Sequence, residues 1–223
     1  MYKALFLDFY GTLVHEDDEY IEEICTNILK SSSTQATTRE IGAYWWKAFS
    51  TRFVSSYGDH FMSQRDIEIY ALEDTIGFYK SSLNPEKLSQ ILFDHWQSPQ
   101  LFQDTKVLLG SIKTPTIILS NIDRNDIEAA VRYNGLTLDN IITSEDVRAY
   151  KPRSEMFQEA LRVSNFSPNE VLHVGDSLTS DIVGAQEVGI KVAWINRKYK
   201  ECPHTYSPDY IIHSLDELIT LLS

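Results

Sequence analysis

The feature of this sequence that most constrains its fold is a series of short apolar runs, most of them followed by a segment with helical spacing. From about residue 99 onward, strands are predicted at residues 116–119, 141–143, 170–174, 191–195 and 210–212. Strands that alternate with helices favour a parallel sheet, because each parallel connection must cross over one face of the sheet. The sequence therefore predicts an α/β fold with a doubly wound parallel sheet.

A further strand is predicted near the N-terminus, where an apolar run at residues 4–7 leads directly into Asp8. Asp8 would then lie at the carboxyl end of a buried strand, where open α/β sheets bind their ligands. Gly11 allows the backbone to bend closely around a bound group, and Thr12 adds a hydroxyl. We expect this strand to join the same sheet as the later ones.

Residues 15–98 show helical spacing and no good strand. Four helices are expected there, with Thr38 as the N-cap of the second and Asn84-Pro85 at the start of the fourth. Aromatic stripes within and just after this block indicate packing rather than a ligand site, at residues 44–53 and 93–102.

The change of pattern at Ser98-Pro99 places a domain boundary there. We predict an α/β core made of residues 1–14 and 99–223, with residues 15–98 as an inserted all-helical domain. Within the core, Lys151-Pro152 is expected to open a helix that continues to Leu161.

Composition limits the class of function. The 223 residues carry a formal net charge of −12, which argues against nonspecific binding to nucleic acid or to an anionic membrane. No segment approaches the roughly 18 apolar residues of a membrane span, and no signal-peptide pattern is seen, so a cytoplasmic location is expected. Cys25 and Cys202 are interpreted as free thiols. The sequence does not indicate an oligomeric state.

Polar side chains follow four of the predicted strands or their connections. In a doubly wound sheet these positions gather at one edge. In chain order the side chains are those of Asp8 and Thr12, of Ser120 and Asn121, of Lys151, and of Asp176 and Asp181. Several carboxylates brought together need a cation or a raised pKa. Mg²⁺ is the natural partner, because it takes oxygen ligands from one or two carboxylates together with waters and a substrate phosphate.

The chemistry of the remaining groups fits a phosphoryl substrate. Lys151 would add a fixed positive charge, and the hydroxyls of Ser120 and Thr12 can donate to phosphoryl oxygens. Thr12, Ser120 and Asn121 are the candidate substrate-binding residues. A carboxylate held beside a metal and a phosphate can attack in line and form an aspartyl-phosphate.

The order of these motifs resembles the haloacid dehalogenase-like hydrolase superfamily. The motifs are Asp-x-x-Gly-Thr-Leu from Asp8, Ser-Asn after a strand, Lys-Pro, and Gly-Asp-Ser-x-x-Ser-Asp ending at Asp181. The resemblance covers residues 1–14 and about 99–223, and the helical block stands where that family carries a helical cap. It implies a Rossmann-like core and a cap that closes over the site.

The resemblance also implies roles for single residues. Asp8 would be the nucleophile, and Asp8 with Asp176 would bind Mg²⁺. Ser120 and Lys151 would contact the transferred group. Asp181 falls on the last acidic position of the final motif, which is usually a metal-shell or lysine-orienting carboxylate.

Tyr10 departs from the pattern of the family's phosphatases, which place an acid/base aspartate two residues after the nucleophile. A phenol with a pKa of about 10 is a poor base near neutrality, although the Tyr10 backbone carbonyl can still bind the metal. A tyrosine here is similar to the family's metal-independent 2-haloacid dehalogenases. Those enzymes carry a cap arginine after a Leu-Trp pair, and Trp46 stands in its place here.

His173 is interpreted as a packed core histidine.

Three hypotheses follow. The leading one is a Mg²⁺-dependent phosphatase for a small phosphorylated metabolite, with the metal held by Asp8, Tyr10, Asp176 and Asp181. The second is a metal-independent 2-haloacid dehalogenase. The third is a catalytically weak family member that binds a phosphorylated ligand or a protein partner.

Overall fold

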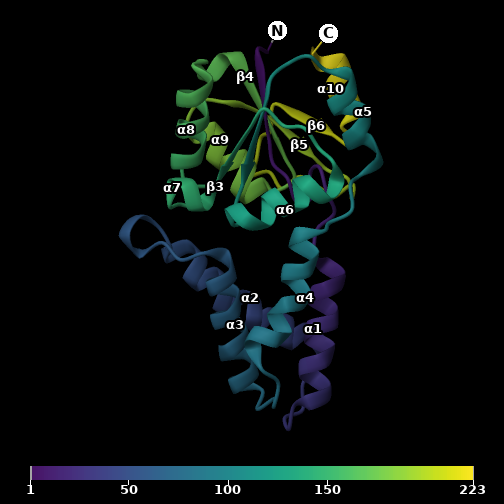
Figure 1. Ribbon diagram of the computed structural model, residues 1–223, viewed down its shortest axis with the longest axis vertical. Helices are drawn as coiled ribbons and strands as arrows, with labels where there is room; N and C mark the ends of the chain where they lie inside the picture. The colour runs from purple at the N-terminus through teal and green to yellow at the C-terminus, as the bar shows by residue number, and fades with distance from the viewer. Residues whose placement is uncertain (1, 223) are drawn as a thin grey trace.

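The computed structural model describes residues 2–222, and these form a parallel sheet with helices on both faces and a separate group of helices at one end (Figure 1). The strand order is β3-β2-β1-β4-β5-β6, and every neighbouring pair is parallel. This order is the one of a doubly wound sheet, so the predicted fold class is confirmed. The strands are β1 (Ala4–Leu7), β2 (Thr116–Ser120), β3 (Asn140–Thr143), β4 (Val171–Gly175), β5 (Lys191–Ile195) and β6 (Tyr210–Ile212).

Alternate residues of β1 pack into two different hydrophobic clusters because successive side chains of a strand point to opposite faces. Ala4 and Phe6 lie in the cluster under α8 (Glu155–Ser164) and α9 (Val183–Glu187). Leu5 and Leu7 lie in the cluster on the other face. The helices of that second face are α5 (Gln103–Ser111), α6 (Arg124–Asn134) and α10 (Asp216–Leu222). β1 is therefore buried on both faces, as its uninterrupted apolar sequence predicts.

The first four α-helices after β1 pack mainly on one another, below the sheet in Figure 1. They are α1 (Asp18–Ser31), α2 (Thr38–Ser55), α3 (Gln64–Phe78) and α4 (Pro85–Gln97), and together we call them the helical bundle. Asn84 caps α4 as predicted. The N-cap of α2 is Thr37 rather than Thr38, since Thr37 accepts from the Glu40 backbone while the Glu40 carboxylate accepts from the Thr37 backbone.

The predicted start of a helix at Lys151-Pro152 is wrong. These residues form a turn with a cis peptide bond, and α8 begins only at Glu155. The reason is a contact between distant parts of the chain, because the Lys151 amide donates to the Asn121 side chain at 2.7 Å and the chain must turn before a helix can start.

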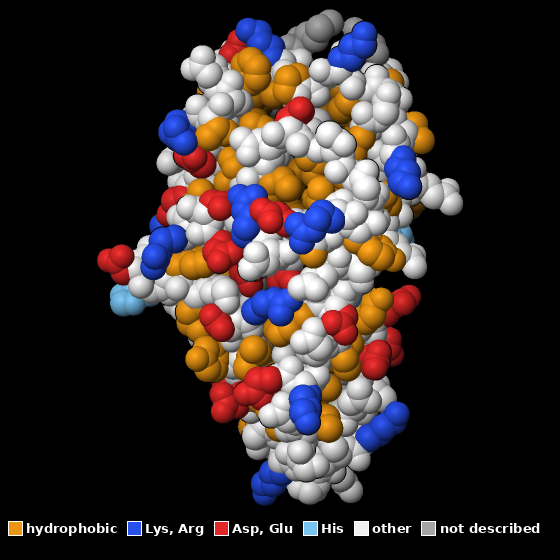
Figure 2. Space-filling model, in the orientation of Figure 1, with side chains coloured by type: hydrophobic (Ala, Val, Ile, Leu, Met, Phe, Trp, Pro, Cys, Tyr) orange, Lys and Arg blue, Asp and Glu red, His pale blue; other side chains and the backbone are white. Residues whose placement is uncertain are grey.

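The sheet and the helical bundle meet through charged side chains, which lie over this junction in Figure 2. The Asp123 carboxylate accepts the backbone amides of Gln64 and Arg65, at 2.8 and 2.9 Å, in the first turn of α3. The Arg65 guanidinium donates twice to the fully buried Asp126, at 2.7 and 2.5 Å. Two aspartates of the sheet domain therefore hold the start of one bundle helix.

Replacing Arg65 with methionine is expected to lower the free energy of unfolding by about 2 kcal/mol, because it leaves the buried Asp126 carboxylate without its charged partner. The matched control is Arg52→Met, which removes an exposed ion pair to Asp74 within the bundle and is expected to cost at most about 0.5 kcal/mol. Urea unfolding of both variants measures the difference. Equal losses would mean that Arg65 does not stabilise the junction.

Both cysteines are free, as predicted. Within residues 2–222, no helix is long and apolar enough to cross a membrane. The cytoplasmic location stays a prediction.

Candidate active site

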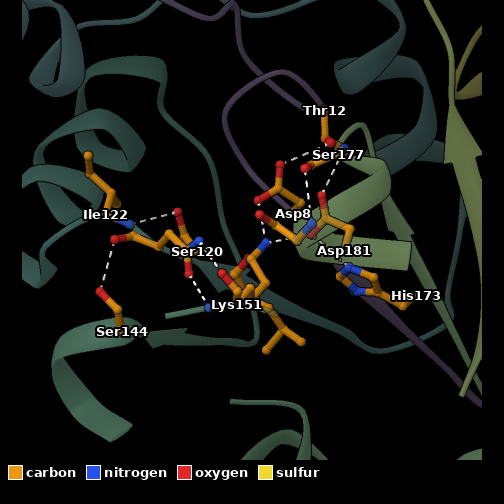
Figure 3. Close-up of polar contacts among 12 residues, drawn as sticks. Asp8, Thr12, Ser120, Ile122, Ser144, Lys151, His173, Ser177 and Asp181 are labelled. Carbon is orange, nitrogen blue, oxygen red and sulfur yellow. Dashed lines mark hydrogen bonds and ion pairs between the residues drawn. The ribbon is translucent and has the colours of Figure 1, made fainter. Parts of the chain in front are cut away.

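Lys151 lies at the centre of the polar cluster (Figure 3). Its Nζ donates to Asp8 Oδ1 at 2.7 Å, to Asp181 Oδ1 at 2.6 Å and to the Leu119 carbonyl at 2.8 Å. The side chain is only 2% exposed. Burial alone would lower the pKa of Lys151, but the two carboxylates outweigh this effect and raise it, so the ammonium stays charged. A buried positive charge therefore lies directly beside Asp8.

Asp181 is the second carboxylate that holds Lys151. Its Oδ1 also accepts from His173 Nε2 at 3.0 Å, and its Oδ2 accepts from the Ser177 backbone amide at 3.1 Å. Burial alone would raise the pKa of Asp181, but Lys151 and His173 hold it below its usual range. Both oxygens already have partners, so this geometry fits a lysine-orienting carboxylate better than a direct metal ligand.

His173 is fully buried in β4, as predicted for a core histidine, but it also has a polar partner. Burial lowers the pKa of His173, and Asp181 is an acceptor, so the neutral ring carries its proton on Nε2. Its neighbour on the other side is the ring edge of Phe157. Sequence alone gave no sign of the contact with Asp181.

Asp8 lies at the end of β1 and is 7% exposed. Its Oδ2 accepts from the Thr12 hydroxyl at 3.1 Å, and its Oδ1 accepts from Lys151. Burial raises the pKa of Asp8 to about 6, although Lys151 opposes the rise. Above this pH the carboxylate is charged and oriented, which is what a nucleophile requires.

Asp176 follows β4, which lies next to β1 in the sheet. The strand order reverses between these two strands, and doubly wound sheets bind their ligands at such a point. Its carboxyl lies against Gly11, where an added Cβ would come within 2.7 Å of Asp176 Cγ. Gly11 also has a φ of +84°, so a side chain is excluded there on two grounds. Gly175 is needed for a similar reason, because a Cβ there would collide with Asp181.

The acidic cluster suits a hard divalent cation. Single oxygen atoms of Asp8, Asp176 and Asp181 all lie within 4.8 Å of one another. Burial raises the pKa of Asp176 well above its usual value, and the charges of Asp8 and Asp181 raise it further. Across residues 2–222, no hydrogen bond or ion pair reaches the Asp176 carboxylate. A carboxylate so placed needs a cation, and Mg²⁺ prefers such oxygen ligands.

Ser120 is the last residue of β2, and Asn121 follows it. Both line the same cavity as Asp8, which has a volume of about 210 Å³ and which we call the Asp8 cavity. The Ser120 hydroxyl oxygen accepts from the Ile122 amide at 3.4 Å, and its own proton is available to a ligand. The Asn121 side-chain amide instead makes two hydrogen bonds to the Lys151 backbone. It donates to the Lys151 carbonyl at 3.2 Å and accepts from the Lys151 amide at 2.7 Å. Asn121 therefore positions Lys151, and its contact with substrate stays a prediction.

Tyr10 also lines the Asp8 cavity, but its hydroxyl donates to the backbone carbonyl of Trp96 at the end of α4. Burial raises the pKa of Tyr10 well above 10, and nearby Asp126, Asp17 and Asp8 raise it further. The phenol therefore stays protonated and bridges the sheet domain to the bundle.

Four residues of the bundle and its N-terminal connection also line the Asp8 cavity, and sequence reasoning missed them. They are Glu16, Asp17, Gln64 and Trp96. The capping position of Ser63 fixes where α3 starts, but only the way the bundle docks brings Gln64 to the cavity.

This geometry agrees with comparisons to known proteins. A family model described as haloacid dehalogenase-like hydrolase matches residues 2–189. The chain belongs to this family. The predicted family and the predicted enzyme class, a hydrolase, are therefore confirmed.

Two curated relatives and one solved structure illustrate the family. Pyrophosphatase PpaX of Bacillus anthracis is 34% identical over 179 residues, covering 69% of this chain and 81% of that protein. Haloacid dehalogenase-like hydrolase domain-containing protein 3 of Danio rerio is 32% identical over 142 residues, covering 60% of this chain but only 58% of that relative. L-2-haloacid dehalogenase from Xanthobacter autotrophicus superposes with a TM-score of 0.77 at 20% identity, covering 100% of this chain and 98% of the other. At that identity the superposition concerns the fold alone.

Proposed function

We propose that this protein is a Mg²⁺-dependent phosphatase that hydrolyses a small phosphorylated metabolite through an aspartyl-phosphate at Asp8. The observation that carries the proposal is the half-buried Asp176 carboxylate, which lies beside Asp8 without a protein cation of its own. A metal-independent dehalogenase has no use for such a carboxylate. The similarity to a pyrophosphatase supports the same class of reaction.

In this proposal each residue has a defined task. Asp8 attacks phosphorus. Thr12 holds Oδ2 of its carboxylate and Lys151 holds Oδ1. Lys151 and Ser120 bind the phosphoryl oxygens, while Asp181 and Asn121 keep Lys151 in place. Asp8, Asp176 and the Tyr10 backbone carbonyl would hold Mg²⁺, which when bound would neutralise the charge of the phosphoryl group.

The same proposal assigns a role to the helical bundle and a class to the substrate. Residues 15–98 act as a cap that excludes water and selects the substrate, over a core of residues 1–14 and 99–223. The substrate is a small molecule rather than a nucleic acid, in keeping with the net charge of −12. Tyr10 leaves protonation of the leaving group without the usual aspartate, so turnover is slower than in relatives that carry one.

A panel of phosphate monoesters tests the proposal. We expect phosphate release in the presence of Mg²⁺ and none after chelation. Folded, Mg²⁺-supplied protein that releases phosphate from no member of a broad panel would refute it. Halide release from 2-chloropropionate in the presence of chelator would instead support the dehalogenase hypothesis, which Tyr10 favours.

The pH dependence of Mg²⁺ activation gives a second readout of the same experiment. The pKa of Asp8 is raised to about 6, so the carboxylate is mostly ionised at pH 7 and mostly protonated at pH 5. Because protons then compete with the metal, the Mg²⁺ concentration for half-maximal activity should rise about tenfold as the pH falls from 7 to 5. A half-activating concentration that does not depend on pH would argue against Asp8 as a ligand.

A further inference from the structure

A second cavity of about 210 Å³ lies within the helical bundle, between α1, α2, α3 and α4. It shares Asp17, Gln64 and Trp96 with the Asp8 cavity, so the two adjoin at these side chains. We call it the bundle pocket.

Aromatic rings make up much of the pocket wall, and they are those of Trp45, Trp46, Phe49 and Trp96. Flat rings at a wall favour flat or apolar ligand surface. The volume is below the roughly 300–1,000 Å³ of pockets that enclose a drug-sized ligand, so it suits a group the size of a single ring.

The residues that the structure describes around the bundle pocket offer no cation to an anionic leaving group. Among the described residues that line the bundle pocket there is no lysine or arginine, whereas Asp17 and Glu68 contribute carboxyls. In the Asp8 cavity, the lining residues described include a single cation, Lys151, whose Nζ already has three partners. A second phosphate or a carboxylate would thus be buried without a partner.

The pocket already disfavours negative charge on its own side chains. Burial raises the pKa of Glu68 to about 8, and its carboxyl accepts from Trp45 Nε1 at 2.6 Å. Burial also raises the pKa of Asp17, which accepts from Trp96 Nε1 at 3.2 Å. The same surroundings would act on a carboxylate of the ligand.

A larger cavity of about 700 Å³ adjoins the Asp8 cavity at Glu16 and Asp176, and it does have basic lining residues. Arg197 is held there by Asp104 through two hydrogen bonds, and Lys198 pairs with Glu16 and Asp18. Lys200 lines the same cavity, and none of these three cations lines the Asp8 cavity or the bundle pocket.

We infer that the substrate is a phosphate monoester whose leaving group lies in the bundle pocket and is ring-sized and either uncharged or positively charged, so that neither pyrophosphate nor a phosphorylated acid is the substrate. This inference rests on the proposed phosphatase function. It separates this chain from its relative named a pyrophosphatase, whose leaving group would be a second phosphate.

Three benzyl phosphates of matched reactivity test the inference: the unsubstituted ester, the 4-aminomethyl ester and the 4-carboxy ester. We expect kcat/KM for the 4-carboxy ester and for pyrophosphate to be at least about tenfold below that of benzyl phosphate. The 4-aminomethyl ester should equal or exceed benzyl phosphate. A 4-carboxy ester or pyrophosphate that reacts as well as benzyl phosphate would overturn the inference.

Calorimetry with the corresponding non-hydrolysable benzylphosphonates, at saturating Mg²⁺, keeps this test separate from that of the phosphatase reaction. Absence of turnover with the expected order of binding would refute the proposed function but support the charge preference of the pocket. Turnover with the reverse order would refute the inference alone. Absence of both turnover and binding would refute both.

A charge introduced at the pocket mouth provides the matched variant. Trp46 is 67% exposed, so Trp46→Arg adds a cation without disturbing the core, and it should raise the kcat/KM ratio of the 4-carboxy ester to benzyl phosphate at least about threefold. Val54→Arg makes the same change in charge at a position of α2 that is 74% exposed and does not line the pocket, and the ratio should not change. Equal ratios in both variants would count against the inference.

Discussion

Replacing Asp8 with asparagine is expected to lower Mg²⁺-dependent phosphate release by at least about 10³-fold. Asparagine is nearly the same size, and its side-chain oxygen can still accept from Lys151, so the fold should persist. The amide oxygen is, however, a poor nucleophile and a weak metal ligand. The variant therefore removes the bond to phosphorus that the proposed mechanism requires.

The matched control is Asp74→Asn, which makes the same chemical change in an exposed ion pair of α3. Its rate should stay within about twofold of the wild-type rate, because surface ion pairs contribute little. Thermal unfolding should confirm that both variants are folded. An Asp8→Asn rate within tenfold of wild type would contradict the role of Asp8 and favour an interpretation as a binding protein.

The sheet and its polar edge could be predicted from sequence because they depend on local patterns. Apolar runs specify the strands, and a parallel sheet brings the ends of its strands to one edge. Asp8, Lys151 and Asp181 were therefore expected to meet, and the structure brings their charged atoms within hydrogen-bonding distance. The roles assigned to them remain proposals.

Contacts that depend on how separate units dock could not be predicted in this way. Gln64 reaches the Asp8 cavity because Asp123 holds the first turn of α3. The hydrogen bond from His173 to Asp181 depends on the close approach that Gly175 allows. Neither follows from residue spacing along the chain. The start of α8 was misjudged because Lys151 is held by Asn121, a contact across the sheet edge.

Replacing Tyr10 with aspartate is expected to raise kcat for phosphate monoesters at least about tenfold. A positioned general acid contributes roughly 10²–10⁴-fold, and incomplete positioning in a substituted site reduces that gain. The surroundings favour the acid form, because the burial and the charges of Asp126, Asp17 and Asp8 that raise the pKa of Tyr10 would raise that of a carboxyl there. The new carboxyl could then protonate the leaving group.

The substitution also has a structural cost, because Tyr10 donates to the Trp96 carbonyl and its ring packs edge-on against Phe9. We expect a loss of about 3 kcal/mol in the free energy of unfolding. Tyr10→Asn is the matched control, since it makes the same cavity but supplies no titratable proton. If aspartate is faster than asparagine at equal Mg²⁺, the limitation at Tyr10 is chemical; if the two variants are equally fast, Tyr10 is not what limits the reaction.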